Sequence, residues 1–277
     1  FRPDAQDIED LAEEVIRLRG YDSLVSRPPK VALGVASEED QIILKDRIRS
    51  FLTGAGASEV YNYSFLSKKE VGLEAVELAN PMSNQYQFLR DSLKPDLIKN
   101  LESNRRFFDV VRIFEIGKVF SNQKGKVLEK LMLGVGIFSK DSYLELKGLL
   151  DSLLGSLGIT DYELIEKEEN ALKINIDGAE AGSLELASGL RQASIIELDL
   201  DLLLKNISEE KEFKPLSKFP SITRDLSIYV PNEVRVGGIL DLIQRVSSKL
   251  VQDVDLIDFY DKTSDEEKRK GLTFRIV

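Results

Sequence analysis

The spacing of apolar residues predicts a helix shortly after Arg90, followed by a strand. Apolar side chains recur there at helical spacing: Leu93, Leu97, Ile98 and Leu101. Asp91 or Ser92 can cap this helix, and Pro95 suits its first turn. Residues 110–117 are rich in β-branched and aromatic side chains, and apolar residues would lie on both faces of a strand there. We therefore expect a central strand covered on both faces.

The segments on either side of this helix and strand predict further strands. One strand is expected to end at Arg90. Residues 121–125, Ser-Asn-Gln-Lys-Gly, predict a turn into a strand at 131–138, so we expect the two strands to pair antiparallel. Gly134 and Gly136 belong to that strand rather than to a phosphate-binding loop, because no helix beginning with Lys-Ser/Thr follows them.

The first 24 residues predict a helix that carries its acidic residues on one face. Asp7 can cap it and Gly20 can end it; its apolar stripe is Ile8, Leu11, Val15 and Leu18. Three carboxylates follow at positions i, i+3 and i+4, with a fourth just upstream: Asp10, Glu13, Glu14 and Asp4. Such oxygen ligands suit Mg²⁺. Alternatively, they complement the helix dipole and pair with Arg17.

Two more helices with their strands are expected around the central region. Ser37 can cap a helix that ends near Gly54, with a buried face of Ile42, Ile43, Ile48, Phe51 and Leu52. Residues 59–65 alternate like a strand. A leucine-rich helix at 143–158 has an apolar stripe broad enough for a core or for a partner helix, and two or three strands follow it, ending at 195–200.

The last 65 residues predict a separate unit. Pro215 and Pro220 precede a strand that alternates through Val230. A helix follows, with a stripe of Ile239, Leu242, Ile243, Val246 and Leu250. Residues 254–260 and 272–277 then form a hairpin. This β-α-β-β order is the first part of a ferredoxin-like fold.

Composition excludes several kinds of chemistry. The 277 residues are 42% hydrophobic and 31% charged, without an apolar run long enough to cross a membrane. There is no cysteine and no histidine, which rules out disulfides, thiolate metal sites and imidazole bases within the chain. The net charge of -10 divides into -11 for residues 1–212 and +1 for the rest, with 11 Lys and Arg against 10 Asp and Glu, so nucleic-acid contact is expected at the C-terminal end.

Three sequence motifs follow one another along the chain. The first, R-x-D-x₅-D-L-x-E-E-V-x-R-x-x-G-Y, starts at Arg2. The second, NPxS…LRxSLxPxL…N…FEIG, starts at Asn80, and K-F-P-S-x-x-R-D-L-S starts at Lys218. Together they resemble the β subunit of phenylalanine-tRNA synthetase, of the bacterial type, over nearly the whole chain. The resemblance implies that the chain is a C-terminal fragment of a longer protein.

The resemblance implies an α+β fold in three parts. Residues 1–27 would be the C-terminal end of a winged-helix-like B5 domain. Residues 28–208 would be a catalytic-like module with the antiparallel sheet and helices of a class II synthetase core, and the helix and strand up to Phe65 would lie at a subunit interface. Residues 209–277 would be a partial ferredoxin-fold anticodon-binding domain.

The resemblance also implies where the sites are. Asp4, Asp10, Glu13 and Glu14 match four acidic residues that hold Mg²⁺ in a site shared with the α subunit. No catalytic residue is expected in this chain, because it has no Gly-x-Gly-x-x-x-Arg motif for ATP. Arg90 and Arg112 are instead expected to form structural ion pairs. Cationic candidates for contact with tRNA are Lys214, Lys218, Arg224, Arg245, Lys249, Arg269 and Lys270.

The function implied is that of a non-catalytic portion of phenylalanine-tRNA ligase, which joins L-phenylalanine to tRNA(Phe) with consumption of ATP. The portion would scaffold the catalytic α subunit in a cytoplasmic α2β2 heterotetramer and would bind tRNA, while ATP would be bound by the α subunit. One alternative is a non-enzymatic paralogue that binds protein or RNA. The other, a self-sufficient ATP-dependent ligase, is disfavoured by the missing ATP motif.

Overall fold

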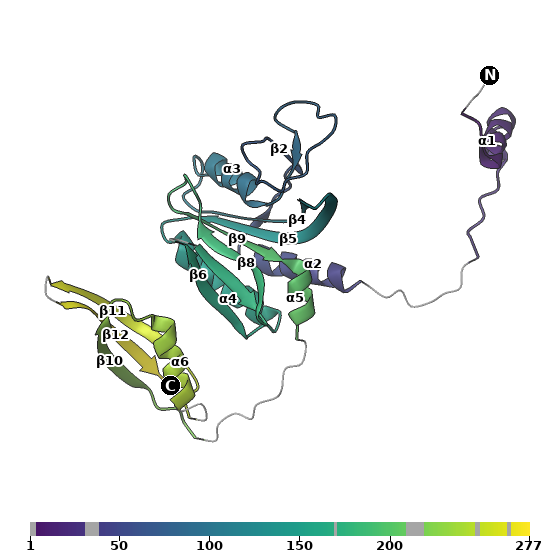
Figure 1. Ribbon diagram of the computed structural model, residues 1–277. Coiled ribbons are helices and arrows are strands. Elements are labelled where there is room, and N and C mark those ends of the chain that lie inside the picture. The colour runs from purple at the N-terminus through teal and green to yellow at the C-terminus, as the bar shows by residue number, and fades with distance from the viewer. Residues whose placement is uncertain (1–3, 31–38, 169–170, 209–218, 247–249, 265–266) are drawn as a thin grey trace. The chain divides into compact units, whose positions relative to one another are not determined.

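The computed structural model describes residues 4–30, 39–168, 171–208, 219–246, 250–264 and 267–277 (Figure 1). The chain divides into two compact units, Phe1–Lys211 and Glu212–Val277. The cap predicted at Ser37 lies outside the described residues.

The N-terminal helix forms as its sequence predicts. Helix α1 spans Ile8–Arg19, with Asp7 as its N-cap and Gly20 at its C-cap with a positive φ of 93°. A short 3-10 helix, η1, follows at Tyr21–Ser23. No residue of α1 is buried, and its apolar stripe, from Ile8 to Leu18, is exposed.

A seven-stranded sheet forms the centre of the first unit. Its strand order is β1-β4-β5-β9-β8-β7-β6, and all neighbours are antiparallel except β1 and β4, which are parallel. The strands are β1 (Ser58–Glu59), β4 (Val111–Gln123), β5 (Lys126–Phe138), β6 (Tyr162–Glu168), β7 (Ala171–Ile176), β8 (Ala179–Leu186) and β9 (Ala193–Asp199). A separate pair consists of β2 (Phe65–Leu66) and β3 (Phe88–Leu89).

The hairpin of β4 and β5 confirms the antiparallel pairing predicted across residues 121–125. Gln123 pairs with Lys126, and the two residues between them, Lys124 and Gly125, both have positive φ, at 53° and 84°. Two successive positive φ values are typical of the type I′ turn, whose twist matches that of the strands it joins. The second strand begins five residues earlier than predicted because cross-strand pairing continues up to the turn.

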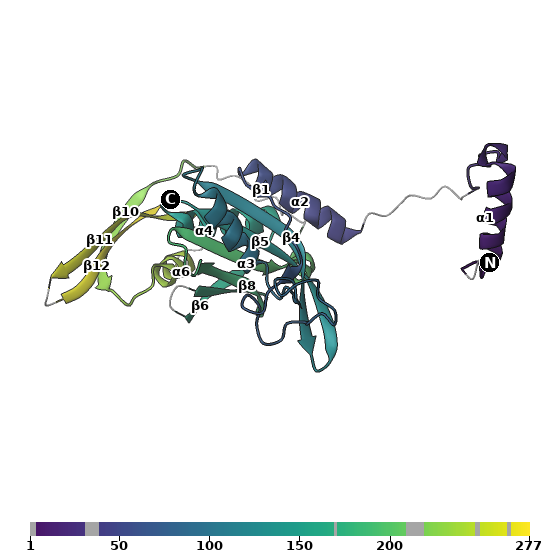
Figure 2. The ribbon, with the colours of Figure 1, turned by 90° about the horizontal axis from the view of Figure 1, so that it is seen from above.

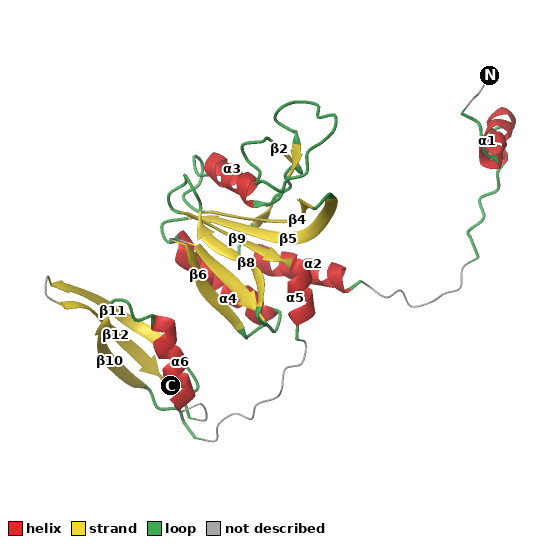
Figure 3. Ribbon diagram, in the orientation of Figure 1, coloured by secondary structure: helices red, strands yellow, loops and turns green. Residues whose placement is uncertain are grey.

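Helices cover both faces of the large sheet (Figure 3). One face is covered by α2 (Asp40–Gly54), α4 (Ser142–Ser156) and α5 (Leu200–Asn206), which share a core with Phe114 of β4 and with β5, β7, β8 and β9. The other face is covered by α3 (Lys94–Asn104). From above, α2 lies beside β1 (Figure 2). The FEIG strand, β4, is therefore a central strand covered on both faces, as predicted.

Helix α3 packs tightly because β5 presents glycines beneath it. A Cβ atom at Gly134 would lie 2.6 Å from Leu97 Cδ1, and one at Gly136 would lie 3.1 Å from Leu101 Cδ1. Leu93, Leu97 and Leu101 are each 0% exposed. Burying a leucine side chain of this kind contributes about 1.5–3 kcal/mol, so these three leucines are a principal source of stability on this face.

Four local predictions were wrong, each because tertiary contacts override local pattern. The strand expected at 59–65 is limited to β1 and β2. In α2 the buried residues are Leu44, Ile48 and Leu52, whereas Ile42 and Ile43 are 45% and 38% exposed. Four strands, β6 to β9, follow α4 instead of two or three. The N-cap of α3 is Leu93, without a side-chain cap of its own, rather than Asp91 or Ser92.

The second unit has the predicted β-α-β-β order. It consists of β10 (Arg224–Pro231), α6 (Val236–Val246), β11 (Val254–Ser264) and β12 (Glu267–Ile276). Its sheet order is β10-β12-β11, and both pairings are antiparallel. Ile239 of α6 packs with Leu272 and Phe274 of β12 in a small core.

Among the described residues, no helix is both long enough and apolar enough to cross a bilayer.

We expect Gly134→Ala to destabilise the first unit, because its Cβ would displace Leu97 from the core. The expected cost is about 1–3 kcal/mol of unfolding free energy, measured by urea denaturation. The control is Gly148→Ala on the exposed side of α4, where no atom lies within 4 Å of the added Cβ. That variant should be up to about 1 kcal/mol more stable than the wild type. Equal effects of the two substitutions would refute the tight packing of α3 on β5.

Candidate functional site

The N-terminal acidic residues lie on or just before α1. Asp10 Oδ2 accepts hydrogen bonds from the backbone N–H groups of Gln6 and Asp7, at 2.8 and 3.0 Å, and so completes the helix cap. Glu14 Oε2 lies 2.6 Å from Arg17 Nη2. Asp4 and Glu13 are exposed. The alternative to metal binding is thus met in both parts, because Asp10 is in the first turn of α1, where it complements the helix dipole, and Glu14 pairs with Arg17.

Among the described residues, no three Asp, Glu, His or Cys side chains are grouped so as to hold a metal ion. The four candidate acids do not by themselves form a cage for Mg²⁺, which prefers nearly ideal octahedral oxygen geometry. A complete site at this position would need oxygen ligands from outside the described chain.

Arg90, at the start of the central motif, forms a buried ion pair. Its Nη1 lies 2.6 Å from Glu115 Oε1, and the two side chains are only 4% and 3% exposed. Arg90 Nε also donates to the carbonyl of Lys118, and Asn62 donates to the other oxygen of Glu115 at 2.7 Å. These bonds offset the cost of burying both charges. The expectation that Arg90 is structural is confirmed.

Arg112, the second arginine near the motif, is also paired. Its Nη2 lies 2.8 Å from Glu145 Oε2 of α4, and both side chains are about one-third exposed, at 36% and 32%. The expectation of a structural ion pair is confirmed here too.

A second carboxylate, the half-buried Glu197 of β9, anchors the beginning of α3. Its Oε1 accepts from the backbone N–H of Leu93 at 2.7 Å, and its Oε2 accepts from the Ser92 hydroxyl at 3.0 Å. Burial raises the pKa of Glu197 above its ordinary value, opposed by the Leu93 N–H, by Lys94 and by Ser92. Sequence reasoning missed this residue, because the helix cap comes from a strand 104 residues away.

On the sheet face beneath α3, an acidic residue of β4 and one of β9 therefore flank β5, and α3 fills the space between them. Glu115 and Glu197 pair with opposite sides of Gly134 in the sheet register. Leu93 and Leu97 fill the notch above that glycine. The carboxylates bind α3 and the segment before it, so they are committed to structure and not to a ligand.

An aromatic groove lies beside the β2–β3 pair. Two adjoining cavities of about 320 and 720 Å³ share three rings, Tyr63, Phe65 and Tyr86. Tyr63 and Tyr86 meet edge to face at 6.3 Å. Tyr63 is 76% exposed, and Tyr61 on the rim is 79% exposed. Exposed aromatic side chains gathered in one place often mark a docking site.

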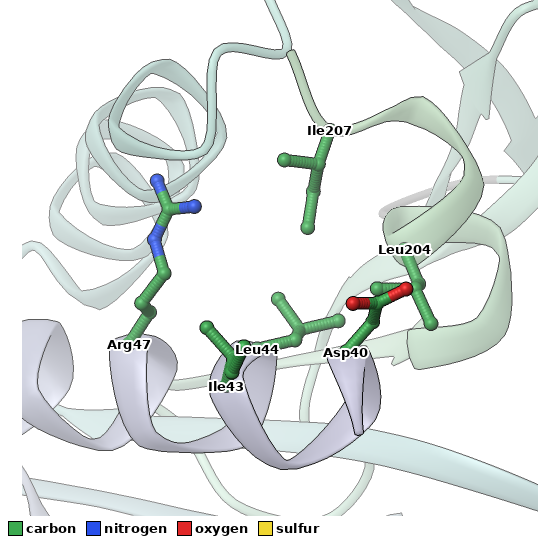
Figure 4. A pocket seen from close by; sticks show the side chains of 6 residues that line it. All are labelled: Asp40, Ile43, Leu44, Arg47, Leu204 and Ile207. Carbon is green, nitrogen blue, oxygen red and sulfur yellow. The ribbon is translucent and has the colours of Figure 1, made fainter. Parts of the chain in front are cut away.

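Another pocket, of about 340 Å³, lies between α2 and the end of α5 (Figure 4). Its walls are apolar, from Ile43, Leu44 and residues at the end of α5, with Asp40 and Arg47 on either side. Arg47 Nη2 donates to the Ser156 carbonyl at 3.2 Å. The pocket contains no pair of groups placed for acid–base or nucleophilic chemistry.

The C-terminal sheet exposes two tyrosines on the face opposite α6. Tyr229 of β10 and Tyr260 of β11 pair with the two sides of Gly271 on β12. They are 66% and 59% exposed, and Tyr229 Cε1 would lie 3.2 Å from a Cβ at Gly271. The glycine leaves room for the ring. Sequence reasoning missed these residues, although an aromatic residue at a polar position of an alternating strand is a readable signal.

The predicted cationic residues of this unit are scattered. Arg224, Arg245 and Arg269 are exposed, whereas Lys270 is half-buried and donates to the Asn232 carbonyl at 2.9 Å. Lys214, Lys218 and Lys249 lie outside the described residues. Arg269 lies on β12 two residues before Gly271, on the same face as the tyrosines.

Comparison with solved structures defines the class of fold. Pyrrolysyl-tRNA synthetase from Desulfitobacterium hafniense aligns with 71% of this chain and 73% of its own chain, at a TM-score of 0.50 and 17% identity. A second structure of the same enzyme aligns equally well, at 0.50 over 75% of its chain. The large sheet and its helices thus have the fold of an aminoacyl-tRNA synthetase core.

Sequence comparison defines the family. Residues 24–177 match the model described as the phenylalanyl tRNA synthetase beta chain CLM domain, and residues 217–277 match the ferredoxin-fold anticodon binding domain. The chain belongs to the phenylalanyl-tRNA synthetase beta chain family, as the sequence motifs indicated.

Curated relatives agree with this assignment. The phenylalanine–tRNA ligase beta subunit of Clostridium tetani is 29% identical over all of this chain and 39% of its own length. Those of Bacillus licheniformis and Bacillus subtilis are 31% and 29% identical over 97% of this chain and 38% of their length. The chain thus spans about two fifths of the length of these relatives.

We expect the pKa of Glu197 to appear in the pH dependence of stability. A carboxyl group with a raised folded-state pKa contributes stability below its unfolded pKa and loses that contribution as the pH rises through the folded pKa. The unfolding free energy of the wild type should therefore increase relative to that of Glu197→Gln as the pH is lowered from neutral towards the ordinary pKa of a glutamate, measured by urea denaturation at each pH.

Glu180→Gln is the control. The hydrogen bond from Lys173 lowers the pKa of the exposed Glu180, so the contribution of Glu180 to the unfolding free energy changes only under more acidic conditions. Its difference from the wild type should stay nearly constant over the same range. Glu197→Ala, which leaves Leu93 N–H without an acceptor, should cost about 1–3 kcal/mol. A pH-independent difference for Glu197→Gln would contradict the raised pKa.

Proposed function

We propose that this chain is a scaffolding and tRNA-binding portion of the β subunit of a phenylalanine–tRNA ligase. That enzyme makes phenylalanyl-tRNA(Phe) from ATP, L-phenylalanine and tRNA(Phe). The observation that carries the proposal is the order of two family matches, 24–177 and 217–277, along one chain. The proposed division is residues 1–27 as the end of a B5 domain, 28–208 as the catalytic-like module and 209–277 as the anticodon-binding domain. The proposed location is the cytoplasm.

In this proposal the chain does no chemistry of its own. A class II synthetase holds ATP with arginines. Here Arg90 and Arg112 are bound to Glu115 and Glu145, and α3 fills the sheet face between Glu115 and Glu197. ATP and phenylalanine would be bound by the catalytic α subunit.

The Mg²⁺ site is proposed as shared between chains. Asp10, Glu13 and Glu14 lie within two turns of α1, and Asp4 precedes it, so their carboxylates can approach a common partner surface. Because these four do not make a complete cage, the remaining ligands would come from the α subunit. When bound, the ion would link the two chains by charge and coordination.

The surface for the α subunit is proposed at two exposed apolar groups of the first unit. One is Ile42 and Ile43 on α2, the helix that the family resemblance implied would lie at a subunit interface. The other is the aromatic groove with Tyr61 and Tyr63. Interface cores are enriched in aromatic residues, and exposed groups of this kind are costly in water unless a partner covers them. The stripe of α4 is excluded, because Leu146, Leu150 and the other leucines facing the sheet are core residues.

We expect this chain, co-expressed with a bacterial phenylalanine–tRNA ligase α subunit, to form a stoichiometric complex, detected by light scattering after size exclusion. The double variant Ile43→Ser with Tyr63→Ser should weaken the complex at least about tenfold, because two apolar anchors are lost. Val127→Ser, at a similarly exposed apolar position near the β4–β5 turn, is the matched control and should bind normally. No complex with a folded wild-type chain would favour a non-enzymatic paralogue.

The tRNA surface is proposed on the exposed face of the C-terminal sheet. Tyr229 and Tyr260 present their rings to solvent beside Gly271. Exposed aromatic rings stack on unpaired RNA bases, and nearby cations contact phosphates. Arg269 lies on the same face, while Ser227 Oγ and Thr273 Oγ1, 2.9 Å apart, supply hydroxyl groups that can bond to base edges.

We expect Tyr229→Ala and Tyr260→Ala each to weaken binding of a tRNA(Phe) transcript about 5- to 100-fold, from the loss of one stacked base. Tyr→Phe at either position should retain most of the affinity, because the ring is kept. Tyr21→Ala is the matched control, as Tyr21 is 57% exposed but lies on η1. Filter binding measures all of these, and unchanged affinity for the alanine variants would remove this face from the proposal.

A further inference from the structure

Three connections meet at one end of the large sheet. Val111, the first residue of β4, pairs with Phe138 at the end of β5, and Phe138 pairs with Ala193, the first residue of β9. The connections 105–110, 139–141 and 187–192 therefore lie at the same end of three adjacent strands. The backbone N–H of Ser139 donates to the Gln192 carbonyl at 3.0 Å and holds two of these connections together.

Two adjacent phenylalanines are exposed in the first of these connections. Phe107 is 79% exposed and Phe108 is 59% exposed, and neither belongs to a core cluster of the described residues. Both backbone N–H groups donate to the Asn104 carbonyl, at 2.9 and 3.2 Å. The turn after α3, rather than side-chain packing, thus holds the two rings in water.

Cations surround these rings. The three connections contain four cations, Arg105, Arg106, Lys140 and Arg191, and two carboxylates, Asp109 and Asp141. Their net charge is +2, although residues 1–212 together carry a net charge of -11. All four cations are exposed. Arg105 lies 3.9 Å from Glu102, a weak contact. For Arg106, Lys140 and Arg191, no carboxylate within the described part of the chain lies at salt-bridge distance.

Exposed aromatic rings beside unpaired cations are the arrangement by which proteins bind single-stranded nucleic acid. Ring faces stack on bases, while Lys and Arg follow the phosphates. Arginine also stacks through its guanidinium plane. A purely apolar partner would leave the cations without counter-charges, so the cations favour a polyanion.

We propose that this end of the sheet, Arg105 to Phe108 with Lys140 and Arg191, binds an unpaired stretch of RNA. This surface is separate from the tyrosine face of the C-terminal unit. The inference rests on the proposed function, in which the RNA is part of the tRNA.

The test measures binding of the full 277-residue chain to a fluorescein-labelled oligoadenylate and to a tRNA(Phe) transcript, by fluorescence anisotropy over a series of salt concentrations. Phe107→Ala with Phe108→Ala should weaken oligoadenylate binding at least about tenfold. Arg106→Ala with Lys140→Ala and Arg191→Ala should reduce the slope of log affinity against log salt by about 2, since each phosphate contact on a single strand contributes roughly 0.7. Leu73→Ala, at a fully exposed apolar position, is the control and should bind as the wild type does.

The outcomes separate this inference from the function on which it rests. If the wild type binds neither RNA, the proposed tRNA-binding role fails together with the inference. If the wild type binds and the Tyr229 and Tyr260 variants lose affinity while the Phe107–Phe108 and cation variants do not, only the present inference is overturned. Weakened assembly with the α subunit but unchanged RNA binding in the phenylalanine variant would assign the surface to a protein partner and would also overturn it.

Discussion

The docking of α3 on the sheet is the interaction on which the first unit depends. Carboxylates on the two strands that flank β5 help to hold it: the buried Glu115 of β4 binds Arg90, just before the helix, and the half-buried Glu197 of β9 binds Ser92 and Leu93 at its start. Between them, leucines of α3 fill the space above Gly134. Moving α3 would therefore take the Leu93 N–H and the Ser92 hydroxyl away from Glu197 and would open a cavity above the sheet. The helix and the sheet are therefore a single packed body.

This packing closes one face of the synthetase-like sheet. A substrate site needs open space and polar groups free to bind a ligand. On this face of the sheet the space contains leucine side chains, and the carboxylates are bonded to the protein itself. The exposed apolar groups of this unit lie elsewhere, at the isoleucines of α2, in the groove around Tyr63 and in the phenylalanine turn after α3. They are the surfaces on which the proposals of binding rest.

In the C-terminal unit, one face of the sheet packs against α6 and the other is exposed, because side chains alternate along each strand. Alternate residues of β12, such as Leu272 and Phe274, pack with α6, while Gly271 and Thr273 lie on the opposite face. Because successive side chains on a strand point to opposite faces, the same short strand builds a core and presents the two flanking tyrosines. A glycine between the tyrosines keeps the surface flat enough for their rings.

Local periodicity in the sequence determined α1 with its Asp7 cap, the β4–β5 hairpin, α4 and the β-α-β-β order of the second unit, because helices, turns and alternating strands depend on residues a few positions apart. The ion pairs of Arg90 and Arg112 were also expected. Only the tertiary structure decided that Glu197 anchors α3, that Ile42 and Ile43 are exposed, and that Tyr229 and Tyr260 flank Gly271. Each of these depends on which distant segments pack together, such as the 104 residues between Leu93 and Glu197. Periodicity identifies the apolar side of an element, but the neighbouring elements decide which of its residues are covered.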